Sequence, residues 1–118
     1  MDIRTESFGL DKNVMRSLSE IFESTSEIDK VVIFGSRAKG NFLEGSDIDL
    51  SISGKAISFD TLLNLMDKVE NLGLLYKIDI LNHRTITDAD VLEHIHQAGK
   101  IFWKRGIKQK KLKLLKKQ

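Results

Sequence analysis

The chain has no cysteine and no proline, and only one tryptophan and one tyrosine among its 118 residues. Without cysteine it forms neither disulfide bonds nor thiolate metal sites, which fits a reducing compartment. Without proline its turns rely on glycine, asparagine and aspartate. No apolar run approaches the roughly 20 residues of a membrane-spanning helix, and the N-terminus lacks the pattern of a signal peptide. We therefore expect a cytoplasmic protein that does not enter a membrane.

Acidic residues are missing from the C-terminal end of the chain. Residues 1–103 hold all 17 Asp and Glu but only 11 of the 19 Lys and Arg, a net charge of −6. Residues 104–118 hold the other 8 basic residues. An acidic body suits divalent cations, whereas a basic tail indicates an anionic partner or simply a solvated terminus. Length and charge predict one domain, residues 1–103, followed by a basic tail, residues 104–118.

The spacing of apolar residues predicts a mixture of helices and short strands. The predicted helices are 10–24, 37–41, 58–72 and 88–97, and the predicted strands are 30–34, 47–53, 76–81 and 100–103. Ser36 is placed to cap the short second helix. This order predicts an α+β fold, a small mixed β-sheet with helices packed mainly on one face.

Three aspartates share one face of the predicted sheet. Because side chains alternate along a strand, Asp47 and Asp49 point away from the isoleucine-rich face of their strand. If that strand pairs with strand 76–81, Asp79 joins them. Three carboxylates at such range repel unless a cation lies between them, and oxygen-only ligands favour Mg²⁺ or Mn²⁺. Any one of them alone would be explained as an ordinary exposed polar residue.

A glycine–serine turn follows the first predicted strand. Gly35 permits close backbone approach or positive φ, and Ser36 offers a hydroxyl and a backbone N–H. A helix starting there would direct its positive end toward an anion. Arg37 and Lys39 could neutralise a triphosphate. Alone, this segment would be an ordinary turn with two surface charges; the aspartates downstream favour nucleotide binding.

These motifs together resemble the signature of the DNA polymerase β-type nucleotidyltransferase superfamily, over about residues 30–103. The matching positions are Gly35, Ser36, Arg37, Ala38, Lys39 and Gly40, then Ser46, Asp47, Ile48, Asp49 and Leu50, and later Asp79. The small size resembles its minimal nucleotidyltransferase (MNT) branch, the antitoxin half of HEPN/MNT toxin–antitoxin pairs. Lys39 departs from the arginine common in this branch and lacks bidentate phosphate contact. The lysine-rich tail lies outside the resemblance.

The resemblance implies a polymerase β-like fold and a role for each matching residue. It implies that Gly35, Ser36, Arg37, Lys39 and Ser46 bind the triphosphate of ATP. It also implies that Asp47, Asp49 and Asp79 hold two Mg²⁺ ions, with Asp79 completing the metal site or taking the proton of the attacking hydroxyl. The implied reaction transfers AMP from ATP to a tyrosine hydroxyl of a partner HEPN ribonuclease toxin, in a hetero-oligomer with that toxin, and silences it.

Other functions stay open at this point. The chain could neutralise a toxin by stoichiometric binding, with a vestigial site. It could also modify a small molecule such as an aminoglycoside, although such enzymes usually carry a second domain for the acceptor. A nucleic-acid polymerase is disfavoured because the basic residues form a tail and not a groove-lining stripe.

The remaining histidines and aromatic residues are assigned to packing. His94 and His96 are two residues apart and do not share a helix face, so we expect them, with His83, to be surface or helix-packing residues. Tyr76 and Trp103 are expected in the core or at an interface.

Overall fold

The computed structural model describes residues 7–106, so residues 107–118 of the predicted tail lie outside the described part. The elements are α1 (Lys12–Glu23), β1 (Lys30–Phe34), α2 (Ser36–Lys39), β2 (Ile48–Ser53), α3 (Phe59–Glu70), β3 (Ile78–Asn82), a 3-10 turn (His83–Thr85), α4 (Ala89–Ala98) and β4 (Lys100–Lys104). Within residues 7–106 no helix has the length and apolarity to cross a membrane.

The strands form one four-stranded sheet in the order β3-β2-β1-β4. β1 pairs antiparallel with β2 and with β4, whereas β2 and β3 are parallel. The parallel pair is possible because α3 carries the chain back between its two strands. The predicted α+β fold with a mixed sheet is confirmed.

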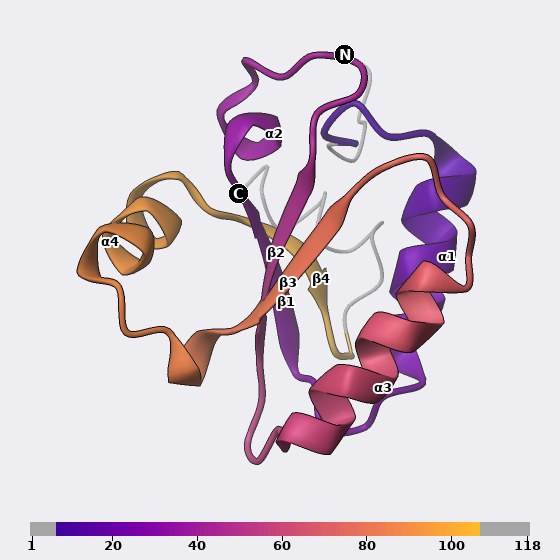
Figure 1. Ribbon diagram of the computed structural model, residues 1–118, viewed down its shortest axis with the longest axis vertical. Helices are drawn as coiled ribbons and strands as arrows, with labels where there is room; N and C mark the ends of the chain where they lie inside the picture. The colour runs from indigo at the N-terminus through magenta and orange to yellow at the C-terminus, as the bar shows by residue number, and fades with distance from the viewer. Residues whose placement is uncertain (1–6, 107–118) are drawn as a thin grey trace.

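Two long helices cover one face of this sheet, as the sequence predicted. α1 and α3 lie side by side against it (Figure 1). Under them Ile48, Leu50 and Ile52 of β2 are fully buried, as are Leu18 of α1 and Leu65 of α3. Burying each such side chain stabilises the fold by roughly 1.5–3 kcal/mol. This face holds the hydrophobic core.

The opposite face of the sheet is covered by α4, which Figure 1 shows on the other side from α1 and α3. Ile95 is the one buried residue of α4. Because strand side chains alternate, Asp49, Ser51 and Asp79 belong to this face. Asp49, Ser51 and Asp79 are thus separated from the core by the sheet itself.

Two details of the prediction are wrong. β3 begins at Ile78 and not at Tyr76, because its pairing with β2 starts at Ile78, opposite Ile48. The Tyr76 ring lies instead against the guanidinium of Arg37, 5.0 Å from ring centroid to Cζ. Ser36 is the first residue of α2 and does not cap it; Gly35 occupies the cap position. α2 has only four residues, so its macrodipole is too small to support the expected attraction of an anion to a helix end.

Arg105 ties the end of the described chain to α1. Its guanidinium donates hydrogen bonds to the carbonyls of Phe22, Thr25 and Ile28 at 2.8–3.2 Å. It also lies over the Trp103 ring, 5.0 Å from the centroid. These bonds satisfy carbonyl groups around the end of α1, which would otherwise need water. Trp103 is buried, as predicted.

Candidate active site

The turn after β1 brings its glycine against the carboxylate of Asp49. Gly35 has φ 75° and ψ −159°, a conformation that residues with a Cβ avoid. A Cβ at this position would collide with Asp49 Oδ2. Glycine is therefore required for two independent reasons, and its absent side chain is the space that the carboxylate occupies.

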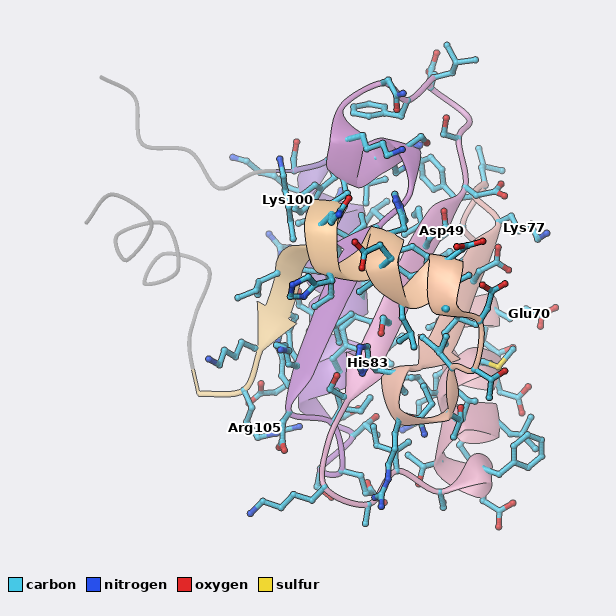
Figure 2. The ribbon with its side chains drawn as sticks, turned by 90° about the vertical axis from the view of Figure 1, so that its left-hand side faces the viewer. Asp49, Glu70, Lys77, His83, Lys100 and Arg105 are labelled. Atoms are coloured by element: carbon cyan, nitrogen blue, oxygen red, sulfur yellow. The ribbon has the colours of Figure 1, made fainter. Side chains whose placement is uncertain are left out.

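Two of the three aspartates predicted to share a face, Asp49 and Asp79, do so. Asp49 of β2 is the direct register partner of Asp79 of β3, in strands about 4.8 Å apart. Burial raises the pKa of Asp49, and the charges of Asp79 and Asp47 raise it further. His94 and, to a smaller extent, Lys77 partly offset this rise in the pKa of Asp49. Lys77 lies at the same end of the sheet as Asp49, as Figure 2 shows. Asp47 precedes β2 and is exposed.

The three carboxylates are not arranged around a ready metal position. No group of three or more Asp, Glu or His side chains in residues 7–106 has the geometry to hold an ion. Carboxylates with no cation between them repel, so side chains turned apart are the expected arrangement. The donor set still fits Mg²⁺, because Asp47, Asp49 and Asp79 offer only oxygen ligands and already share one electrostatic environment.

Arg37 does not project toward the site as a free cation, contrary to the expectation that it binds triphosphate. Its side chain is 2% exposed. Its guanidinium donates to the carbonyls of Phe8, Glu44 and Ser46 at 2.9–3.1 Å. Because its guanidinium is already hydrogen-bonded to these carbonyls, Arg37 holds the loop before β2 in place.

The other residues predicted to bind the nucleotide lie on the same turn and loop. Ser36 is half-buried at the start of α2, and Lys39 is exposed at its end. Ser46 accepts a hydrogen bond at its Oγ from the N–H of Leu43, at 2.8 Å, which closes the loop before Asp47. Ser46 thus shapes the approach to Asp47 from within the loop.

His94 joins the site, and the sequence analysis did not place it there. Its Nε2 accepts a hydrogen bond of 2.9 Å from the Gly35 N–H. Its ring packs edge-on against the Phe34 ring, with centroids 6.0 Å apart. A signal was present, because His94 follows Val91 by three residues and precedes Ile95, so it lies on the sheet-facing side of α4. Gly35 therefore offers this N–H to His94 and not to a phosphate in this structure.

The other two histidines behave as predicted. His83 and His96 are both exposed. A cavity of about 300 Å³ between α3 and β3 contains none of the predicted site residues; its lining includes Met66, Leu74 and Tyr76. This cavity is therefore separate from the candidate site around Asp49.

Comparisons with known proteins agree with this geometry. The profile of the family described as polymerase beta, nucleotidyltransferase, matches residues 16–108. A candidate protein adenylyltransferase of Methanocaldococcus jannaschii is 29% identical over 90 residues, which cover 73% of this chain and 88% of that protein.

Two solved structures share the fold at lower identity. A toxin–antitoxin crystal structure with AMP-PNP gives a TM-score of 0.60 at 19% identity, covering 91% of this chain and 83% of that chain. The complex of tri-AMPylated Shewanella oneidensis HEPN toxin with MNT antitoxin gives 0.57 at 14% identity, covering 87% and 77%. The family profile spans most of the chain and includes the glycine–serine turn and all three aspartates. The chain belongs to the polymerase beta nucleotidyltransferase family.

Proposed function

We propose that this chain is a Mg²⁺-dependent protein adenylyltransferase that transfers AMP from ATP to a tyrosine hydroxyl of a partner HEPN ribonuclease toxin. In this role it is the antitoxin of that toxin and forms a complex with it. Family membership supports nucleotidyl transfer. The name of the Methanocaldococcus jannaschii relative supports a protein acceptor, and the toxin–antitoxin structures support the partner.

One observation carries the proposal: the Asp49 carboxylate packs on the Gly35 turn and is opposed by Asp79. A phosphate-sized turn thus touches a cluster of carboxylates whose mutual repulsion a cation would relieve. Asp47, Asp49 and Asp79 are the residues that would hold Mg²⁺. When bound, Mg²⁺ neutralises phosphate charge and stabilises the leaving pyrophosphate.

The triphosphate would lie along the turn, contacted by Ser36 and by the exposed ammonium of Lys39. Arg37 is left out of this contact set and acts through the loop that it holds. In the reaction the tyrosine oxygen forms a bond to the α-phosphorus of ATP. The bond from that phosphorus to the oxygen bridging to the β-phosphate breaks, and pyrophosphate leaves with the electron pair. Asp79 accepts the tyrosine proton.

A second function is favoured by one observation. Two solved structures that share this fold are toxin–antitoxin structures, one of them a complex of a HEPN toxin with an MNT antitoxin, so the chain could neutralise its toxin by stoichiometric binding alone. The two functions differ in what Asp49 does. For adenylylation its carboxylate is required; for simple binding an amide of the same shape serves as well.

The test uses the full chain, a HEPN-family toxin as the partner, Mg²⁺ and isotopically labelled ATP. We expect an AMP-sized mass increment on a tyrosine of the partner. Asp49→Asn should slow this labelling by about 100-fold or more, because it removes a negative charge that would hold the Mg²⁺ ion by which the phosphate charge is neutralised. Asp67→Asn, an exposed substitution on α3, is the matched control and should leave the rate unchanged.

Protection of cells separates the alternatives. If Asp49→Asn still protects cells from the toxin as well as the unchanged chain does, stoichiometric binding is the function. If the unchanged chain leaves the partner unmodified with ATP and with every other nucleoside triphosphate, the adenylyltransferase proposal is overturned.

A further inference from the structure

The hydrogen bond between His94 and Gly35 joins two segments 59 residues apart. Because Nε2 accepts the N–H of Gly35, this nitrogen carries a lone pair, and in a neutral ring the proton is on Nδ1. The ring is half-buried and packs against Phe34. Its orientation is therefore set by both an apolar contact and a polar one.

The turn at Gly35 has little stiffness of its own. α2 contributes only a single helical turn, closed by the bonds from Lys39 N–H to Gly35 O and from Gly40 N–H to Ser36 O. Glycine has the widest choice of backbone conformations, so a fixed φ of 75° needs support from outside the segment. His94 supplies that support through the N–H of Gly35, and the Asp49 carboxylate packs where a side chain at Gly35 would lie.

We propose that His94 is a positioning residue for nucleotidyl transfer, whose Nε2 lone pair holds the Gly35 peptide so that Ser36 faces the triphosphate and Asp49 keeps its place against the turn. The role rests on the proposed function. His94 acts through Gly35 and does not contact the reacting atoms. α4 thereby becomes part of the site, although none of its residues belongs to the glycine–serine or aspartate motifs.

Two substitutions distinguish the contribution of the hydrogen-bond acceptor of His94 from the contribution of its ring. His94→Gln keeps a side-chain oxygen close to the place of Nε2, so it can still accept from Gly35. His94→Phe keeps a flat ring against Phe34 but has no acceptor. His96→Phe is the matched control, because His96 is exposed two residues further along the same helix.

The first readout is the hydrogen bond itself. In the uniformly ¹⁵N-labelled full chain, we expect a scalar coupling between the Gly35 nitrogen and His94 Nε2 across the N–H···N bond. This coupling should persist when Mg²⁺ and AMP-PNP are added. Its absence in the free chain, or its loss on adding AMP-PNP, would overturn the proposal, because the bond would then not exist or would be broken by the nucleotide.

The second readout is the affinity for Mg²⁺ and AMP-PNP, measured by calorimetry at a temperature where circular dichroism shows every variant folded. His94→Phe should weaken binding by about tenfold, the cost of one well-placed hydrogen bond. His94→Gln should stay within about threefold of the unchanged chain, and His96→Phe should match it.

The outcomes distinguish this inference from the proposed function. If the unchanged chain binds no nucleotide, the proposed function fails and the role of His94 falls with it. If the unchanged chain binds and His94→Phe binds equally well, only the role of His94 is removed. Equal weakening by the Gln and Phe variants would also remove it, because the acceptor would then not matter.

Discussion

The two faces of the sheet are built from the same strands but differ in their role: one holds the hydrophobic core, and the other carries the candidate site. On β2, Ile48, Leu50 and Ile52 are fully buried under α1 and α3. Asp49, between them in sequence, faces α4 and has a raised pKa because burial and neighbouring carboxylates oppose its charge. The apolar face stabilises the folded state, whereas the polar face contains carboxylates whose charges repel one another.

This difference between the faces explains why the proposed chemistry can lie on the polar face. Carboxylates that repel one another are tolerated because the apolar face, on the other side of the same strands, offsets their cost. A site of this kind binds a cation and a triphosphate partly by relieving its own repulsion. Substitutions on either face test this difference between the apolar and polar faces. They differ in the size of the effect expected on stability, from largest to smallest.

The largest effect is expected at the apolar face. Leu50→Ala should lower the free energy of unfolding by about 2–5 kcal/mol, because it leaves a cavity in a core with no exposed surface at this position. Leu81→Ala is the matched control, since Leu81 lies on the other face and is 37% exposed. Urea denaturation of both variants measures the difference. Equal losses would show that the two faces are not energetically distinct.

The next effect concerns the loop that leads into the carboxylates. Arg37→Lys should lower the free energy of unfolding by about 2–3 kcal/mol, because an ammonium cannot replace the fork that reaches three carbonyls. Lys39→Met, at an exposed position, should leave stability almost unchanged and weaken Mg²⁺·AMP-PNP binding instead. Thermal denaturation measures the stability of both variants, and calorimetry measures their binding of Mg²⁺·AMP-PNP. An Arg37→Lys variant as stable as the unchanged chain would contradict the role of Arg37 in holding the loop.

A buried hydroxyl on the polar face gives a smaller effect of opposite sign. Ser51 is 1% exposed, and within residues 7–106 its Oγ has no hydrogen-bond partner. Ser51→Ala removes this unsatisfied group, so stability should stay level or rise by up to about 1 kcal/mol. Ser53→Ala, at a half-exposed position two residues later, is the control. A clear loss of stability in Ser51→Ala, measured in urea, would show that the hydroxyl has a partner after all.

The smallest effect is expected from the charge of Asp49 and depends on pH. Its pKa is raised on folding, so its ionisation costs stability as pH rises through the acidic range, and the cost persists at neutral pH. Asp49→Asn should therefore melt at a higher temperature than the unchanged chain at pH 7, and the difference should vanish at low pH. Mg²⁺ should raise the melting temperature of the unchanged chain but not of the variant. Melting curves across pH, with Asp67→Asn as control, measure both shifts.

Much of the site was readable from local sequence. The place of Gly35 directly after β1 and of Asp49 within β2 is confirmed. The phase that puts Asp49 and Asp79 on one face follows from alternation along a strand and is also confirmed. The role predicted for Arg37, binding the triphosphate, differs from the one in the structure. In sequence, an arginine in a glycine-rich turn gives no sign of whether it contacts a ligand or backbone carbonyls.

The sequence by itself determined which residues alternate within each strand, and therefore which carboxylates can share a face. Those properties depend on backbone geometry over a few residues. Only the tertiary structure decided that β2 and β3 run parallel, that Arg37 is buried, and that His94 of α4, which packs on β1, accepts a hydrogen bond from Gly35. These depend on which distant segments meet, and that is set by the packing of helices on both faces, which no local pattern specifies.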